Sequence, residues 1–324
     1  MNQLYTRQTL AIPASKPAQN EDSIRHDLSG RPLRLSIHDY HIHGADESGL
    51  TIILTHGTSF NKYFWQMIIE LLLADPHLRA KIKRFIAIDA ANHGDSALLN
   101  TGVLPAKAFW PDDSRDILHT LKHFRVQQPV IGIGHSFGGG AMCHAAMMEP
   151  EAFLATIFIE PILFQMKDQT DGIARMTLKR RDTWDSKADL TAAFQKSASL
   201  KDWDKRQLEV YIEHGTFLVD GGSDSSPRML KTPKAQEAAT YAAAPYPEIL
   251  ALIEQSQGRH HFVWGSVSKV MQSIARIIRP PSTTEVLSGA GHLIPMTHPV
   301  DLSSVLSRLL GDIRLTRGVS QAKL

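Results

Sequence analysis

The sequence of 324 residues predicts an α/β fold with a mostly parallel central sheet, helices on both faces and a helical cap insertion. Two observations predict this fold. Short apolar, β-branched runs alternate with segments of helical spacing, and the alternation stops between about residues 162 and 258. Such alternation is typical of parallel strands that are joined by helices covering both faces of the sheet.

The predicted strands are short apolar runs that end at glycine, charged or proline-containing turns. They span residues 51–55, 84–88, 129–133, 154–159, 261–264 and 284–287. The predicted helices have apolar residues on one face or end close to a proline. They span residues 64–73, 113–124, 141–148 and 302–310.

The break in the alternation predicts three consecutive parts of the chain. Residues 1–161 are the first part of the core, residues 162–258 are a cap or lid, and residues 259–324 are the second part with a C-terminal targeting tail. The middle part is charged and helix-prone, with a stretch rich in glycine, serine and aspartate at 221–227. We expect it to cover the carboxyl edge of the sheet.

Composition narrows the classes of partner. The formal charge is +2, from 35 basic and 33 acidic residues, which gives no reason to expect nucleic acid or an anionic membrane as the main partner. No stretch reaches the roughly 18 apolar residues that a membrane span needs, so no membrane span is predicted. The single cysteine, Cys143, excludes a disulfide within the chain.

A glycine-flanked serine follows the predicted strand 129–133. The stretch Gly134-His135-Ser136-Phe137-Gly138 matches the pattern G-x-S-x-G and opens a helix of small residues. A serine on a strained turn between strand and helix holds its hydroxyl clear of the sheet, and the glycines leave room for the backbone. Ser136 is therefore the predicted nucleophile. The alternative, a phosphate-binding turn, lacks both G-x-G-x-x-G and Gly-Lys-Ser/Thr.

An oxyanion-binding loop is predicted after the strand 51–55. His56-Gly57-Thr58 follows that strand directly. In an architecture of this kind, one backbone N–H comes from this loop and the other from the residue after the nucleophile. The predicted oxyanion donors are therefore the amides of Thr58 and Phe137.

The base is predicted on the glycine-rich loop after the last strand. His292 ends the stretch Gly289-Ala-Gly-His, from which a side chain can reach back over the sheet. His298 is the nearest rival among the 16 histidines, but it lacks the preceding glycines and precedes a proline. His292 is the predicted base.

The acid is displaced from its usual loop. Residues 265–269, after the strand 261–264, hold no carboxylate, and neither does any position from 259 to 284. A carboxylate is still needed to orient the imidazole and to stabilise its charged form. Glu160, at the end of the strand 154–159, is the predicted acid, and Glu285 is a weaker candidate because it begins the next strand.

Together these motifs resemble the α/β-hydrolase superfamily. The resemblance is carried by His56-Gly57, by Asn92-His93-Gly94-Asp95-Ser96, by the serine turn and by Gly291-His292. It implies action on esters or related acyl bonds of a small-molecule acyl substrate, with no metal or organic cofactor. A glutamate at the end of this strand also resembles certain lactone-cleaving members.

A narrower resemblance is to fungal peroxisomal hydrolases associated with toxin biosynthesis, and more distantly to peroxisomal lipase. It is carried by Phe158-Ile-Glu-Pro161 and by the terminal Ala322-Lys323-Leu324, one small-residue change from Ser-Lys-Leu. The tripeptide predicts recognition by the peroxisomal import receptor, with a cytoplasmic location as the alternative. The polar N-terminus lacks the apolar region of a secretory signal.

The predicted function is hydrolysis of a carboxylic ester or lactone of a small to medium hydrophobic substrate through an acyl-enzyme, in the setting of fungal secondary metabolism. We expect Phe164, Met166, Trp184 and Trp203 as candidates for an apolar acyl pocket. The alternatives are a peroxisomal acyl-CoA thioesterase or lipase, a C–C bond hydrolase, and a non-catalytic binding protein. A thioesterase would need a basic patch for the CoA phosphates, for which residues 179–181 are the candidate.

Overall fold

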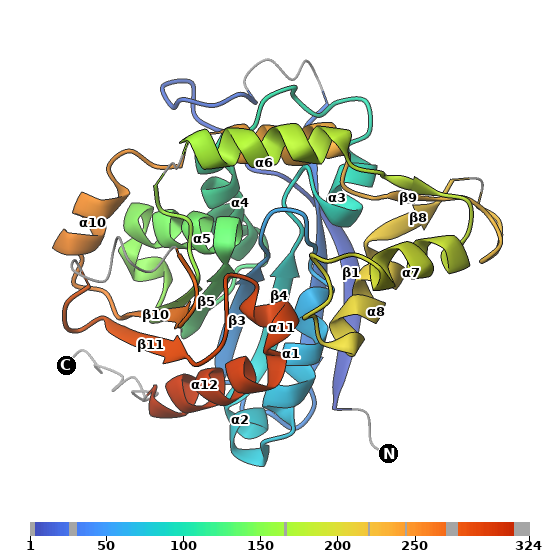
Figure 1. Cartoon of the computed structure of the whole chain (residues 1–324). Helices are drawn as coiled ribbons and strands as arrows, with labels where there is room; N and C mark the ends of the chain where they lie inside the picture. The colour runs from blue at the N-terminus through green and yellow to red at the C-terminus, as the bar shows by residue number, and fades with distance from the viewer. Residues whose placement is uncertain are drawn as a thin grey trace, which may run out of the picture.

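The central sheet has eight strands in the order β1-β2-β4-β3-β5-β6-β10-β11 (Figure 1). In this computed structural model the described residues are 4–25, 31–164, 167–219, 221–243, 245–269 and 278–313. The strands from β4 to β11 run parallel, whereas the β1–β2 and β2–β4 pairs are antiparallel. The strands are β1 (Tyr5–Pro13), β2 (Arg34–Ile42), β3 (Leu50–Thr55), β4 (Ile82–Ile88), β5 (Val130–His135), β6 (Ala155–Ile159), β10 (His260–Gly265) and β11 (Thr283–Leu287).

The inner strands are apolar throughout because both faces of the sheet are covered. Successive residues of a strand point to opposite faces, so Ile52 and Ile53 of β3 belong to two different apolar clusters. Ile53 packs with residues of α4 (Trp110–His123) and α5 (Ser136–Met148). Ile52 packs with residues of α1 (Phe64–Leu73) and α12 (Pro299–Asp312). Figure 1 shows these two helix layers on the two sides of the sheet.

The described structure confirms the predicted α/β class, and most predicted strands and helices lie within two or three residues of their predicted bounds. The helix α3 (Gly94–Leu99), which follows β4, was not among the predicted helices. The remaining short core helices are α2 (Pro76–Lys81), the 3-10 turn η1 (Pro150–Ala152) and α11 (Ile294–Thr297).

The first two strands were not predicted from the sequence. β1 is an edge strand, and its residues Thr6 to Thr9 are polar and exposed, so it lacks the apolar run that marks a buried strand. β2 carries His38 and Asp39 among its apolar residues and buries both of them. Pairing with β4 and with each other places these strands in the sheet, and local sequence patterns do not report such long-range pairing.

Residues 162–258 contain five helices and a small separate sheet within their described part. The helices are α6 (Lys167–Lys179), α7 (Lys187–Gln195), α8 (Lys205–His214), α9 (Lys234–Ala242) and α10 (Ile249–Gln255). The sheet has the order β7-β9-β8, from β7 (Thr183–Trp184), β9 (Arg228–Leu230) and β8 (Thr216–Leu218). In Figure 1, α6 runs above α5, while α7, α8 and the small sheet lie to one side.

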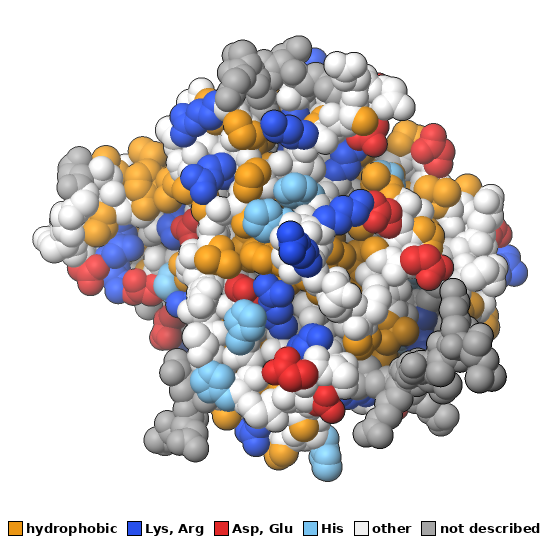
Figure 2. All heavy atoms as spheres, turned by 180° about the vertical axis from the view of Figure 1, so that it is seen from behind, with side chains coloured by type: hydrophobic (Ala, Val, Ile, Leu, Met, Phe, Trp, Pro, Cys, Tyr) orange, Lys and Arg blue, Asp and Glu red, His pale blue; other side chains and the backbone are white. Residues whose placement is uncertain are grey.

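Three observations bear on nucleic acid, membrane and metal as classes of partner. Basic and acidic side chains both occur across the face shown in Figure 2, in agreement with the small net charge. Of the helices that the structure describes, none is long and apolar enough to cross a membrane. Within the same ranges, no group of three or more His, Cys, Asp or Glu residues is arranged to hold a metal ion.

Candidate active site

Ser136 lies at the turn where β5 passes into α5. Its φ is 55°, a left-handed conformation that is strained for a residue with a side chain. The flanking glycines allow this turn. A Cβ on Gly134 would lie 2.5 Å from the carbonyl oxygen of Gly138, and a Cβ on Gly138 would overlap the carbonyl oxygen of His56. Only glycine fits at both positions, so the local sequence dictates this geometry.

The structure brings together the three side chains predicted to form a triad. The Ser136 Oγ lies 2.8 Å from the His292 Nε2, and the His292 Nδ1 lies 3.1 Å from Oε2 of Glu160. The carboxylate only accepts, so Nδ1 carries a proton and Nε2 is free to accept the serine proton. Glu285 instead pairs with Arg308 on the surface. This is the geometry of a nucleophile, a base and an orienting acid.

The loop that lacks an acid supplies hydrogen-bond donors to Glu160 instead. Glu160 is fully buried and has a φ of 48°. Its Oε1 accepts the backbone N–H of Gly265 at 2.6 Å, and its Oε2 accepts the Ser268 hydroxyl at 2.5 Å. A buried carboxylate is costly unless its oxygens are hydrogen-bonded, and these donors meet that need. The sequence did not reveal Ser268, because serines in loops are common.

His135 is a second residue that the sequence left without a role. Its Nε2–H donates to the backbone carbonyl of His292 at 2.9 Å. Burial, followed by the neighbouring His292, lowers the pKa of His135 to about 3, so the ring is neutral near pH 7. His135 therefore ties the loop of His292 to the turn of Ser136.

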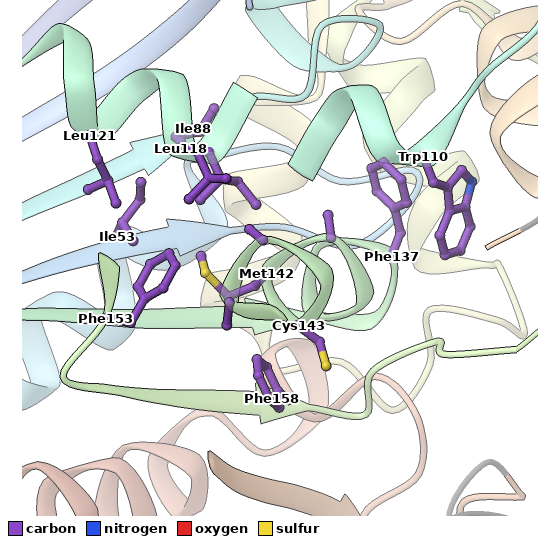
Figure 3. Packing of buried hydrophobic residues seen from close by; sticks show 14 of the residues in the cluster. Ile53, Ile88, Trp110, Leu118, Leu121, Phe137, Met142, Cys143, Phe153 and Phe158 are labelled. Atoms are coloured by element: carbon purple, nitrogen blue, oxygen red, sulfur yellow. The ribbon is translucent and has the colours of Figure 1, made fainter. Parts of the chain in front are cut away.

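The two predicted oxyanion residues flank the serine. Thr58 lines the same cavity as Ser136 and His292. Phe137 is in the first turn of α5, where backbone N–H groups have no partner within the helix, and its side chain packs on Trp110 with ring centroids 4.8 Å apart (Figure 3). Its side chain thus points into the core while its amide stays at the start of the helix.

His56 fixes the loop that precedes Thr58. Its Nε2 accepts the backbone N–H of Ala90 at 3.2 Å, so its Nδ1 carries the proton and donates to the carbonyl of Gly57 at 2.8 Å. Burial lowers the pKa of His56, which keeps this tautomer neutral. A neutral, buried ring thus ties the carbonyl of Gly57 to the loop after β4 at Ala90.

Comparison with known proteins gives the family of this chain. Residues 52–305 match the model of the alpha/beta hydrolase family, a range that includes most of β3, all of β4, β5, β6, β10 and β11, the serine turn and the loop of His292. The chain belongs to the alpha/beta hydrolase family. The sequence-based prediction of this family is confirmed, and the fold of this hydrolase is the one predicted.

Curated relatives are similar over parts of their length. The type I acyl-CoA thioesterase mpaH of Penicillium brevicompactum is 27% identical over 217 residues, 59% of this chain and 49% of that protein. The peroxisomal membrane protein LPX1 of Saccharomyces cerevisiae is 32% identical over 124 residues, 36% of this chain and 32% of that protein. The regions aligned in sequence make up about half or less of the length of these two relatives.

Solved structures show the same fold over nearly the whole chain. The peroxisomal alpha-beta-hydrolase Lpx1 of Saccharomyces cerevisiae superposes with a TM-score of 0.81 at 19% identity, covering 98% of this chain and 92% of that one. E-2-(acetamidomethylene)succinate hydrolase superposes with a TM-score of 0.68 at 15% identity, covering 94% and 100%. At these identities the likeness shows the fold alone.

Ser136 and His292 open onto a cavity of about 510 Å³ between the sheet edge and residues 162–258. Of the predicted pocket residues, Phe164 and Trp203 line it. Trp184 does not meet its prediction, because it is buried against Phe194 within the insertion. Met166 lies outside the described residues. The cavity wall is mostly apolar, with Phe60, Trp110, Tyr211, Ile162 and Leu293 among its other members.

The basic stretch 179–181 is largely neutralised by carboxylates. Arg180 forms a two-bond ion pair with the buried Glu237. Arg181 pairs with Asp189, and its guanidinium lies 5.6 Å from the ring centroid of Trp184. The described structure therefore does not present both arginines as free cations for CoA phosphates.

Proposed function

We propose that this hydrolase cleaves a carboxylic ester through an acyl-enzyme formed on Ser136. The observation that carries the proposal is the chain of hydrogen bonds from Ser136 through His292 to the buried Glu160, which opens on the apolar cavity. A serine whose base is oriented by a third group is the arrangement that activates a hydroxyl for attack on an acyl carbon.

The proposed reaction has two halves. His292 accepts the Ser136 proton as the oxygen attacks the ester carbonyl, and the amides of Thr58 and Phe137 stabilise the oxyanion. The C–O bond to the alcohol then breaks, and His292 gives its proton to the departing alcohol oxygen. Water repeats the sequence on the acyl-enzyme, which releases the carboxylic acid and restores the serine. Glu160 orients the ring and stabilises its charged form in both halves.

The lining of the cavity supports the proposal that the substrate is a small to medium hydrophobic ester or lactone. Aromatic and aliphatic side chains make most of its wall, and residues 162–258 contribute Phe164, Trp203 and Tyr211 to it. We propose that these residues act as a cap over the site. We also propose a peroxisomal location, which the name of the similar peroxisomal membrane protein LPX1 supports, and a role in fungal secondary metabolism. The tripeptide Ala322-Lys323-Leu324 lies outside the described residues.

An acyl-CoA thioesterase is the second candidate. It is favoured by the Penicillium relatives that carry this name. The same serine chemistry would cleave a thioester, with the thiol as the leaving group. The pairing of Arg180 with Glu237 and of Arg181 with Asp189 weighs against a ready phosphate-binding patch at 179–181.

The test is steady-state hydrolysis of p-nitrophenyl butyrate and octanoate beside butyryl- and octanoyl-CoA. We expect turnover of the nitrophenyl esters to be abolished in Ser136→Ala and retained in Ser199→Ala, a matched control on the same cavity wall. A kcat/KM for acyl-CoA that exceeds the ester value would favour the thioesterase. A folded wild-type protein that hydrolyses neither substrate class would contradict the proposed function.

A further inference from the structure

Glu237 of α9 is a buried carboxylate in the insertion, and three separate segments meet at it. Arg180, directly after α6, donates to both of its oxygens. The Ser59 hydroxyl, from the loop after β3, donates to its Oε1 at 2.6 Å. Its side chain is 1% exposed. Glu237 thus connects two helices of the insertion to the loop that carries Thr58.

The hydrogen bonds around Glu237 form a chain with one direction. Ser59 gives its only proton to the carboxylate, so the Tyr241 hydroxyl, 3.1 Å away, donates to the Ser59 oxygen. Burial raises the pKa of Tyr241 to about 12, which keeps that proton in place at neutral pH. The Ser59 hydroxyl is therefore held by two hydrogen bonds, one to Glu237 and one from Tyr241.

Ser59 needs such an anchor because of its backbone. Its φ is 78°, in the left-handed region that residues other than glycine rarely occupy. Conformations of this kind persist only where the surroundings hold them. The residue before it is Thr58, so the turn at Ser59 fixes the Thr58–Ser59 peptide. This peptide adjoins the Gly57–Thr58 peptide that carries the Thr58 N–H, so a change at Ser59 can be passed to that N–H through Thr58.

We propose that Glu237 is a positioning residue for the oxyanion hole, acting through the Ser59 hydroxyl. This inference rests on the proposed function, because it assigns the Thr58 amide to the oxyanion. Its consequence is that the hole is set only while α6 and α9 are seated on the core. The insertion then contributes to the rate of the chemical step and not only to the binding of substrate.

The experiment compares Glu237→Gln, Ser59→Ala and Ser59→Gly with the wild type. We expect Glu237→Gln and Ser59→Ala to lower kcat by about 10- to 100-fold with less than about threefold change in KM. Binding of a trifluoromethyl ketone, which forms a tetrahedral adduct with the serine, should weaken by the same factor. Glycine adopts a positive φ freely, so Ser59→Gly should keep more activity than Ser59→Ala.

Asp189→Asn is the matched control, since it breaks the neighbouring ion pair with Arg181 without touching Ser59. We expect its kcat to equal that of the wild type. Equal kcat in Glu237→Gln, Ser59→Ala and wild type would overturn the inference, as would a rise in KM alone or a Ser59→Gly as slow as Ser59→Ala. The Ser59 pair decides the question if Glu237→Gln unfolds. An inactive wild type would instead contradict the proposed function itself.

Discussion

Two buried glutamates lie near the active-site cavity, and they differ in their hydrogen-bond and ion-pair partners. Glu160, from the sheet edge, accepts a backbone amide, a serine hydroxyl and the imidazole of His292. Glu237, from the insertion, accepts a serine hydroxyl and the permanent cation of Arg180. Both side chains are at most 1% exposed.

The difference separates a carboxylate that is suited to the reaction from one that is suited to support. A carboxylate that stabilises a transient imidazolium must keep its negative charge available, so neutral donors are the fitting partners. The charge of a carboxylate that is paired with arginine is already neutralised, so it stabilises another cation only weakly. Such a carboxylate is better suited to holding a fixed geometry. In the proposed mechanism, the core supplies the negative charge beside His292, and residues 162–258 supply a carboxylate that holds the loop of Ser59.

The largest expected effect distinguishes these two glutamates directly. Glu160→Gln keeps the shape but removes the charge beside His292, so kcat should fall by about 10³- to 10⁴-fold with little change in KM. Glu237→Gln should cost far less. The measurement is steady-state ester hydrolysis, with thermal unfolding to check that each variant is folded. Equal losses of kcat in the two variants would contradict the proposal that Glu160 acts in the reaction and Glu237 only in positioning.

A smaller effect tests the support of Glu160. Ser268→Ala removes the hydroxyl from Oε2, which leaves one acceptor of a buried charge less satisfied. We expect a fall in kcat of about 10- to 30-fold, equivalent to a hydrogen bond to a charged group. Ser266→Ala is the matched control in the same loop, because its hydroxyl accepts the amide of Gly289 and does not contact Glu160. An equal loss in both variants would count against this assignment.

The smallest expected effect is the contribution of His135 to the pH dependence of the free energy of unfolding. The pKa of His135 is lowered to about 3, so the native state leaves the ring neutral where the unfolded chain protonates it. This contribution to stability is present above pH 6.5 and is lost progressively as the pH falls toward 3. Between pH 7 and pH 5.5 the loss is about 1 kcal/mol.

Urea unfolding of wild type and His135→Gln at pH 7 and pH 5.5 measures that loss. The variant lacks the titrating ring, so its stability should fall by about 1 kcal/mol less over the interval. Other buried histidines leave a remaining slope in both proteins, and the difference between the slopes is the quantity that matters. Identical slopes would show that His135 does not titrate differently in the native state.

The sheet edge was predictable because its residues are fixed by local rules. Ser136, flanked by Gly134 and Gly138, and His292, at the end of a glycine-rich stretch, each follow a strand, and the carboxyl ends of these strands meet at one edge of a parallel sheet. Even the position of Glu160 followed, since no carboxylate occurs in the loop where one is usual. The structure brings these side chains within hydrogen-bonding distance of one another.

The insertion and the supporting residues were not predictable in the same way. Ser268, Ser59 and Glu237 are ordinary residue types whose roles depend on contacts between distant segments, such as the 178 positions that separate Ser59 from Glu237. Trp184 fits an apolar pocket by composition but packs inside the insertion instead. Strands β1 and β2 were not predicted for the same reason, because pairing with other strands, and not their own periodicity, places them in the sheet.

The most direct test of the central claim is labelling of the purified protein with a fluorophosphonate, followed by mass spectrometry of the digested chain. Attack by an activated serine leaves a covalent phosphonyl adduct on the nucleophile. The account predicts one adduct, on Ser136, which forms markedly more slowly in Glu160→Gln. A folded wild-type protein that carries no adduct on Ser136, or that is labelled at another serine, would contradict it.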